Sequence, residues 1–230
     1  MLQSMGYVLR TRPYTEASVI VDLFTESTGR MACITRPAKL RGKVQKGHLQ
    51  AFRLLQLHWQ GQSELSRLTQ TDERFRHRIP ASKLLYGLYL NELLLKLVQT
   101  HAPLNILFTT YQHTLQLLCD TELPMVVVMH FELVLLDELG HMPDLWEDDE
   151  HGENIVPTTV YTYGINAGLH LKSSLVNQTA SVPVLGGLLI AMRELDSMSL
   201  EQYQALRQFL DAIWVRIVRK PFNSRKLLHF

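Results

Sequence analysis

The stretch MGYVLRTRPYTEASVIVDLFTESTGRMACITR, residues 5–36, decides the fold that this sequence predicts. It contains three runs with the composition of β-strands, at residues 5–12, 17–26 and 31–36. A Ser-Thr-Gly turn at residues 27–29 separates the second run from the third. The chain therefore opens with three short strands in succession.

Two further runs with strand character follow, at residues 51–60 and 63–73. Five short strands with frequent turns favour a small closed barrel, and the number fits an OB-fold, a Greek-key barrel that often binds oligonucleotides. Residues 37–50 then form the long connection between the third and fourth strands. Alternation along the first strand predicts two faces, with Tyr7 and Leu9 on one and Val8, Arg10 and Arg12 on the other.

The hydrophobic period changes to that of a helix after Pro80. Helical spacing is found over residues 84–97, 104–118 and 124–140, and it resumes near Val184. The last long helix starts at Ser199, whose spacing to Gln202 is that of a capping box. Residues 141–180 are irregular and contain a short β-like piece, VYTYGINAGLHL. The predicted fold class is α+β, with an OB-fold at residues 1–80 and a helical domain at 81–230.

Composition is that of a folded protein, with 230 residues, 46% hydrophobic and 20% charged. No apolar run reaches the roughly 18 residues that a membrane helix needs, and the first residues lack the pattern of a signal peptide. Cys33 and Cys119 are too few for a disulfide framework or a four-thiolate zinc site. Both lie in apolar patterns, so we expect buried thiols in a reducing cytoplasm.

Charge is divided unevenly along the chain. The whole chain has 23 Lys and Arg against 22 Asp and Glu, but residues 1–80 have 13 against 6 and residues 81–175 have 3 against 12. Residues 35–52 contain five of these bases and no acid. This asymmetry indicates a polyanion partner for the N-terminal barrel.

The basic connection is the candidate nucleic-acid-binding element. Lys and Arg bind a phosphate backbone through ion pairing and counterion release, without reading sequence. The candidate residues are those of the connection and three neighbours on the predicted strands: Arg36, Lys39, Arg41, Lys43 and Lys46, with Arg10, Arg12 and Arg53. The alternative interpretation is a solvated surface loop, because many runs of charge have no ligand.

Single-stranded nucleic acid also requires aromatic faces on which bases stack. Tyr14, Phe52 and Trp59 are the candidates. Phe52 and Trp59 lie an odd number of residues apart, so a regular strand places them on opposite faces and at least one belongs to the barrel core. Tyr14 follows Pro13 in a predicted loop and is the preferred stacking residue.

Two further basic groups have alternative interpretations. Arg74, Arg76 and Arg78 alternate around Phe75, and either widen the basic surface or pair with the acidic middle of the chain. A secondary basic patch lies near the C-terminus, at Arg219, Lys220, Arg225 and Lys226. The helix dipole accounts for cations at the end of the last helix, but not for Arg225 and Lys226 beyond Pro221.

The acidic segment 141–153 raises the question of a metal site. It combines His141 and His151 with several carboxylates, namely Asp144, Glu147, Asp148, Asp149, Glu150 and Glu153. The sequence has no HExxH motif and no paired CxxC, so a solvated acidic loop is the preferred interpretation and no metal is predicted. We find no GxSxG or P-loop motif, and Gly186-Gly187 lies in a helix-like stretch rather than after a predicted strand.

Several stretches together resemble the RecO family of bacterial recombination mediators. They are residues 6–30 (GYVLRTRPYTEASVIVDLFTESTGR), the basic connection leading to LQAF at 49–52, LLYGLYLNELL at 84–94, HFELVLLDELGH at 130–141 and FNSRKLL at 222–228. The resemblance implies an N-terminal OB-fold, a helical C-terminal domain and no enzymatic cofactor. It also implies that Arg36, Lys39, Arg41, Lys43 and Lys46 have the DNA role of the family's basic barrel loop.

The resemblance further implies partners. Proteins of this family bind single- and double-stranded DNA, anneal complementary strands, and work with RecR and the single-stranded-DNA-binding protein SSB to help load RecA. Two departures from the family pattern stand out: residues 141–165 contain no Cys for the family's zinc site, and Pro37 stands in the turn before the basic loop. The segment before Phe131 has His130 as its nearest base, which weakens the implied site for the acidic SSB tail.

The leading hypothesis is therefore a non-enzymatic, cytoplasmic and nucleoid-associated mediator of recombinational DNA repair. The alternative is a protein-interaction scaffold whose basic barrel docks an acidic partner and contacts DNA incidentally. A third hypothesis, a metal-dependent nuclease, would use carboxylates of the acidic segment such as Asp148 and Asp149.

Overall fold

The computed structural model describes residues 1–228 except 38–45, 62–63, 173–180 and 219. Internal contacts divide the chain into two compact units: Met1–Val127 with the segment that begins at Phe222, and Val128–Pro221. Among the described residues, no helix is long and apolar enough to cross a membrane.

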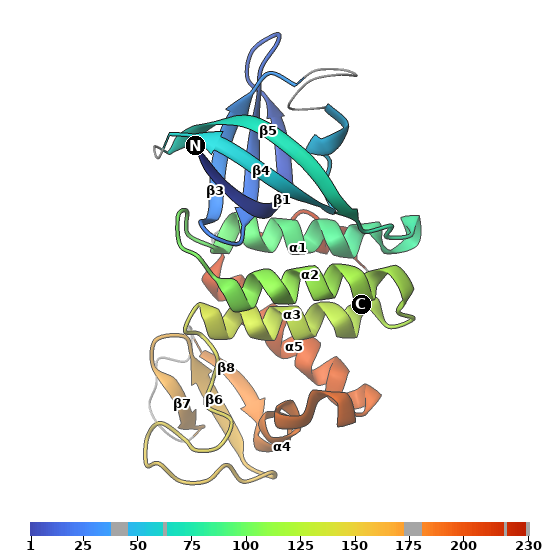
Figure 1. Ribbon diagram of the computed structural model, residues 1–230. Coiled ribbons are helices and arrows are strands. Elements are labelled where there is room, and N and C mark those ends of the chain that lie inside the picture. Colours follow the sequence, from blue (N-terminus) through green and yellow to red (C-terminus); the bar gives the residue numbers. More distant parts are fainter. Residues whose placement is uncertain (38–45, 62–63, 173–180, 219, 229–230) are drawn as a thin grey trace. The chain divides into compact units, whose positions relative to one another are not determined.

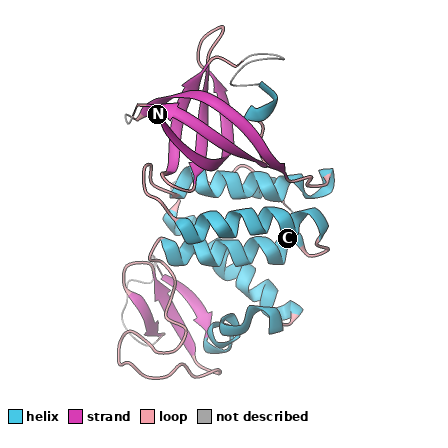
Figure 2. Cartoon of the chain, in the orientation of Figure 1, coloured by secondary structure: helices cyan, strands magenta, loops and turns pink. Residues whose placement is uncertain are grey.

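The first unit begins with a closed five-stranded barrel (Figures 1 and 2). Its strands are β1 (Leu2–Pro13), β2 (Val19–Thr25), β3 (Gly29–Thr35), β4 (Arg53–Gln60) and β5 (Leu65–Arg76), in the order β1-β2-β3-β5-β4. Neighbours pair antiparallel except β3 and β5, which are parallel. The predicted five-stranded OB-type barrel is thus confirmed, and the short parallel pairing of Ala32–Ile34 with Leu65–Arg67 closes it.

Apolar side chains from all five strands fill the barrel. The cluster consists of Val8, Val21, Leu23, Met31, Cys33, Leu49, Leu55, Leu57, Trp59 and Leu68. Burial raises the pKa of the Cys33 thiol to about 12, so it is the buried, unreactive thiol that the sequence predicts. Trp59 is 2% exposed and serves the core rather than a ligand.

A β-bulge in β1 changes the face on which its arginines lie. The register with β2 shifts between Val8 and Arg10, so Leu9 has no directly opposed partner. Val8 points into the barrel, whereas Arg10 is exposed. The prediction that Val8 shares a face with Arg10 and Arg12 is therefore wrong, because simple alternation assumes an unbroken strand.

Two helices follow the barrel in the first unit. A short 3-10 turn, η2 (Ala81–Lys83), leads into α1 (Leu84–Leu97), and α2 (Asn105–Asp120) follows. Both lie where the helical period predicts them, and the change from strands to helices falls near Pro80. As a domain boundary, that position stays a prediction. Cys119, near the end of α2, is partly buried rather than fully buried as predicted.

The outer face of β1 and β2 packs on α2 through aromatic rings. Tyr7 lies opposite Phe24 in the sheet, and both rings point away from the barrel interior. The Tyr7 and Tyr111 ring centroids are 5.1 Å apart, and those of Phe24 and Phe108 are 5.5 Å apart. All four side chains are at most 4% exposed, so the strands and the helix share one aromatic core.

The Asn91 side chain of α1 supplies a hydrogen-bond partner for the backbone at the bulge. Its Nδ2 donates to the Leu9 carbonyl at 3.0 Å, and its Oδ1 accepts from the Tyr111 hydroxyl at 2.6 Å. Asn91 is 2% exposed, so these bonds lie in a dry environment where an unpaired polar group would be costly. One buried amide thus ties β1, α1 and α2 together.

The second unit combines helices with a small sheet. α3 (Pro124–Glu138) begins in the first unit and continues into the second, which also contains α4 (Gly186–Ala191), η3 (Met192–Ser197) and α5 (Leu200–Ile217). β6 (Val160–Gly164), β7 (Gly168–Leu171) and β8 (Ser181–Leu185) form an antiparallel sheet in the order β7-β6-β8. The last short turn, η4 (Arg225–Leu227), returns to the first unit.

The predicted capping box at the start of α5 is confirmed. Ser199 Oγ accepts from the Gln202 amide at 3.3 Å, and Gln202 Oε1 accepts from the Ser199 amide at 2.7 Å. These reciprocal bonds satisfy two backbone donors and fix the start of α5 at Leu200.

β8 was not predicted. Val184, where helical structure was expected to resume, lies in this strand, and the helix begins at Gly186. A strand therefore does precede Gly186-Gly187, contrary to the prediction. A Cβ at Gly186 would lie 2.1 Å from the Val156 carbonyl, so close packing requires this glycine. The amides of Gly186 and Gly187 donate to Thr159 and Pro157, and so are used within the fold.

A buried carboxylate joins α3 to α5. Glu132 is fully buried and receives hydrogen bonds from the Arg207 guanidinium and from Trp214 Nε1, the latter at 2.7 Å. Arg207 also pairs with Asp211 at 3.0 Å. Glu132 is thus held by an ion pair with Arg207 and a hydrogen bond from Trp214, two helical turns further along α5.

We expect Glu132→Gln to destabilise the protein strongly. Removing the charge leaves the buried Arg207 guanidinium without its main counterion, which costs about 3–5 kcal/mol of unfolding free energy in comparable pairs. Urea unfolding followed by circular dichroism measures this loss. The matched control is Asp211→Asn, which removes a partly exposed partner and should cost about 0–1 kcal/mol. Equal losses from the two variants would contradict the assignment.

Candidate nucleic-acid interface

Three segments meet at the end of the barrel from which the basic connection leaves. In the β1–β2 turn, the Tyr14 amide donates to the Ser18 carbonyl at 3.0 Å. Arg36, directly after β3, donates to Ser18 Oγ at 3.4 Å. The 3-10 turn η1 (Lys46–Leu49) is held to β1 by the Thr11 hydroxyl, which donates to the Leu49 carbonyl at 3.1 Å.

The described candidates in these segments are exposed. Tyr14 is 58% exposed, and Arg36 and Lys46 both face solvent. Lys39, Arg41 and Lys43 lie outside the described residues. The structure therefore brings together an exposed aromatic ring and the two cations that flank the basic connection, which are the elements that a single strand of nucleic acid requires.

Arg10 and Arg12 share a single carboxylate. Asp22 on β2 is 4% exposed, and its Oδ2 lies 2.9 Å from Arg10 Nε and 3.3 Å from Arg12 Nε. The two guanidinium groups remain about half exposed. One carboxylate compensates one of the two cations, so this pair retains a net positive charge on the barrel surface.

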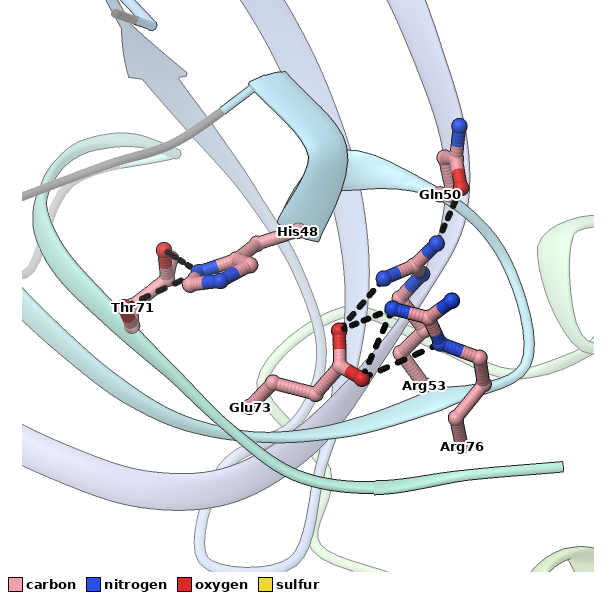
Figure 3. A network of polar contacts seen from close by, with 6 residues as sticks. All are labelled: His48, Gln50, Arg53, Thr71, Glu73 and Arg76. Atoms are coloured by element: carbon pink, nitrogen blue, oxygen red, sulfur yellow. Dashed lines mark hydrogen bonds and ion pairs between the residues drawn. The ribbon is translucent and has the colours of Figure 1, made fainter. Parts of the chain in front are cut away.

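Arg53 is used within the fold (Figure 3). Its side chain is 11% exposed and donates to Glu73 and to the Gln50 amide oxygen. Arg76 donates to the same carboxylate at 3.0 Å. Burial alone would raise the pKa of Glu73, but hydrogen bonds and charge from Arg53 and Arg76 outweigh it and lower that pKa. Arg53 therefore positions Glu73 rather than presenting a free cation.

The aromatic candidates for base stacking differ in exposure. Phe52 is 7% exposed with a positive φ of 65°, and Trp59 is in the barrel core, so neither offers a face to a base. The expectation that at least one of them is core is confirmed. Phe75, not selected from the sequence as a stacking residue, is 48% exposed. Its position between Arg74 and Arg76 was the available signal.

The acidic segment is organised by its own backbone. Asp148 is 4% exposed and accepts from the amides of Glu150, His151 and Glu153, while Asp149 accepts from the Leu169 amide at 2.6 Å. Burial alone would raise the pKa of Asp148, but the three amide bonds lower it. Within the described part of the chain, no group of three or more His, Cys, Asp or Glu is arranged to hold a metal.

The segment after α5 is tied to α1 by Glu92. Its carboxylate accepts from the Asn223 and Ser224 amides at 2.8 and 2.9 Å and from the Ser224 hydroxyl, and it pairs with Lys96 at 2.9 Å. We call this arrangement the Glu92 clasp. Burial alone would raise the pKa of Glu92, but these hydrogen bonds lower it to about 2.

The secondary basic patch is only partly described. Lys220 is exposed, and Arg225 is partly buried with its guanidinium donating to the Leu228 carbonyl at 3.2 Å. Arg219 and the side chain of Lys226 lie outside the described residues. A DNA role for this patch stays a prediction.

The strand order and the helical region identify the class of protein first: an OB-fold barrel followed by helices. Two family models then match nearly the whole chain, "Recombination protein O N terminal" over residues 1–73 and "Recombination protein O C terminal" over residues 81–226. The chain belongs to the RecO family of DNA repair proteins.

Curated relatives agree with this assignment. DNA repair protein RecO of Aliivibrio salmonicida is 32% identical over 224 residues, which cover 96% of this chain and 90% of the relative. The protein of the same name from Nitrosospira multiformis is 32% identical over 97% of this chain and 93% of its own. The protein of the same name from Ralstonia nicotianae is 33% identical over 98% of this chain and 83% of its own.

We expect the Glu92 clasp to open in acid. Because its folded-state pKa lies below the value of about 4.3 for a free side chain, its stabilisation is complete above that pH and is lost as pH falls towards 2. At about 1.4 kcal/mol per pKa unit, the loss is about 2–3 kcal/mol. Hydrogen-exchange protection of residues 222–228, measured across this pH range, tests the loss.

Glu92→Gln is the decisive variant for the clasp. It should show low protection of residues 222–228 already at neutral pH and no further loss in acid. Glu26→Gln, which changes an exposed acid, is the control and should behave as wild type. Unchanged protection in Glu92→Gln would show that the carboxylate does not hold this segment.

Proposed function

We propose that this protein is a non-enzymatic DNA-binding mediator of recombinational repair. It binds single- and double-stranded DNA through the basic end of its barrel, anneals complementary strands, and helps RecR load RecA onto DNA coated by SSB. The observation that carries the proposal is the exposure of Tyr14, Arg36 and Lys46 around a connection that contains three more bases and no acid. Membership of a DNA repair family supplies the context.

Shared carboxylates leave the barrel with a surplus of positive charge, which favours an anionic ligand. Asp22 and Glu73 each face two arginines, so the acids of the barrel compensate only part of its positive charge. A phosphate backbone binds such a surface by releasing its counterions, whatever its sequence. Sequence-tolerant binding is what a repair mediator requires.

Annealing follows from the same chemistry. Two complementary strands repel each other through their phosphates, and cations on a protein reduce that repulsion. Contacts to the backbone leave the base edges free to pair. An exposed ring such as Tyr14 can hold a base by stacking, which does not select one base over another.

The proposed partners RecR, SSB and RecA rest on family membership. For the acidic SSB tail, His130 was the nearest base in the sequence. Burial lowers the pKa of His130, although the charge of Asp196 raises it in part. Burial thus disfavours the charged form of His130, which makes this residue a poor cation for the tail.

The test is the binding of a fluorescent single-stranded oligonucleotide across a salt series. We expect the five cations of the connection alone to contribute a log–log salt slope near −3 to −4, because each contributes about 0.7. Replacing Lys39, Arg41, Lys43 and Lys46 together by Ala should weaken binding of all sequences alike and remove about 2.8 from the slope.

The matched control keeps the charge, with Lys39→Arg, Arg41→Lys, Lys43→Arg and Lys46→Arg combined, and should retain the slope. Affinity of the Ala variant within two-fold of wild type would show that the connection is not the DNA site. A flat slope in the wild type would favour the scaffold hypothesis, in which the barrel docks an acidic protein.

A further inference from the structure

A second basic surface lies at the end of β5, within the first unit. An open cleft of about 780 Å³ is lined by the strand end and by α2, through Glu73, Arg74, Phe75, Arg76, His77, Arg78, Gln116, Cys119 and Asp120. The proposed DNA site at the basic connection does not include these residues. We call this feature the β5 cleft.

The β5 cleft has an excess of positive charge. Arg74 and Arg78 are exposed, and the ion pairs found among the described residues include neither of them. Of its two acids, Glu73 is already paired with Arg53 and Arg76. Asp120 is therefore the remaining acid in the lining, against two unpaired arginines. An anionic ligand is favoured.

Phe75 gives the cleft an aromatic face with a rigid support. The Phe75 ring meets the His77 ring edge-on at a centroid distance of 4.9 Å. His77 is 6% exposed, and its Nε2 lies 3.0 Å from the Tyr7 hydroxyl, which belongs to the aromatic core shared with α2. Phe75 is thus the exposed end of a buried aromatic row, and little side-chain freedom is lost when it is covered.

His77 contributes to the packing of the cleft and not to its charge. Burial lowers the pKa of His77 to about 4, so the ring is neutral at physiological pH. The positive charge of the cleft therefore comes from arginines, which are always protonated and whose planar groups suit phosphate oxygens. Binding should not vary between pH 6 and 8 through this histidine.

The β5 cleft and the 3-10 turn η1 of the proposed DNA site both lie against β5. Lys46 begins η1, and His48 of the same turn lies 3.0 Å from Thr71 Oγ1 on β5 (Figure 3). Two residues further along β5, Glu73 holds Arg53 and Arg76, and Arg74 stands at a bulge beside them. β5 therefore runs from η1 to the cleft, and Arg74 and Arg76 are exposed cations along it.

We infer that the β5 cleft binds a second stretch of single-stranded DNA, with phosphates on Arg74 and Arg78 and a base stacked on Phe75. The combination of unpaired arginines with an exposed, supported ring fits a nucleic-acid strand better than an acidic peptide, which carries charge without bases to stack. This inference rests on the proposed function, because it takes the ligand to be the same DNA.

The test uses the full-length protein and two labelled oligothymidylates of about 8 and about 24 nucleotides, within and beyond the usual site of one barrel. For the longer probe, Arg74→Ala with Arg78→Ala should reduce the magnitude of the salt slope by about 1.4, because each contact to a single strand contributes about 0.7. Binding of the shorter probe should change less. Phe75→Ala should weaken binding of the longer probe at least about five-fold, and Phe75→Tyr should restore it.

Three controls separate the cleft from general electrostatics. Arg74→Lys with Arg78→Lys keeps both charges and should retain the slope. Gln116→Ala alters the lining of the cleft without changing charge, and Lys172→Ala removes an exposed charge from the second unit. Both should bind the longer probe as wild type does. Circular dichroism verifies the fold of each variant.

The outcomes distinguish this inference from the proposed function. If the wild type binds neither probe, both ideas fail. If replacing Lys39, Arg41, Lys43 and Lys46 weakens binding while the Arg74 and Arg78 variant matches wild type within two-fold, the β5 cleft alone is overturned. If polyglutamate binding, and not DNA binding, is lost in the Arg74 and Arg78 variant, the cleft takes an acidic polypeptide and the inference is also overturned.

Discussion

The structure of the first unit depends on β1 belonging to two cores at once. Val8 points into the barrel, while Tyr7 packs outward on the rings of α2. The bulge at Leu9 lets the strand leave this arrangement and present Arg10 and Arg12 to solvent. A bulge in a buried strand leaves a carbonyl without a partner strand in an apolar environment. The Asn91 side chain of α1 donates a hydrogen bond to that carbonyl, which belongs to Leu9. The barrel and its first helices are therefore one packed body.

Electrostatics on this body follow a common arrangement. Each of two carboxylates, Asp22 and Glu73, is held between two arginines. Such sharing fixes the geometry of the arginines and leaves a surplus of positive charge at the surface. In the second unit, by contrast, the charge of Glu132 is fully buried and compensated. The same residue types thus form an exposed positive surface in one unit and a buried helix contact in the other, according to their exposure.

Much of the fold could be predicted because its signals are local. Alternation, turn residues and the change of period at Pro80 gave the five strands and the first helices, and the Ser199 capping box marked α5. β8 was missed because its run of apolar residues continues into the helix that follows, and such a run does not distinguish strand from helix. The prediction of the face on which Val8 lies was wrong because no sequence pattern reliably indicates a β-bulge.

By itself the sequence determined the fold class, the family resemblance and the position of the basic connection, since these depend on residue order and composition. Tertiary structure decided which cations are available. Arg53 is enclosed by Glu73 and Gln50, whereas Arg36 and Lys46 face solvent, and no spacing rule separates them. Tertiary structure also brought Arg74, Phe75 and Arg78 against α2, about forty residues away in the chain, where together they line an open cleft. Pairing between charges is set by distances across strands and helices, and those exist only once the chain has folded.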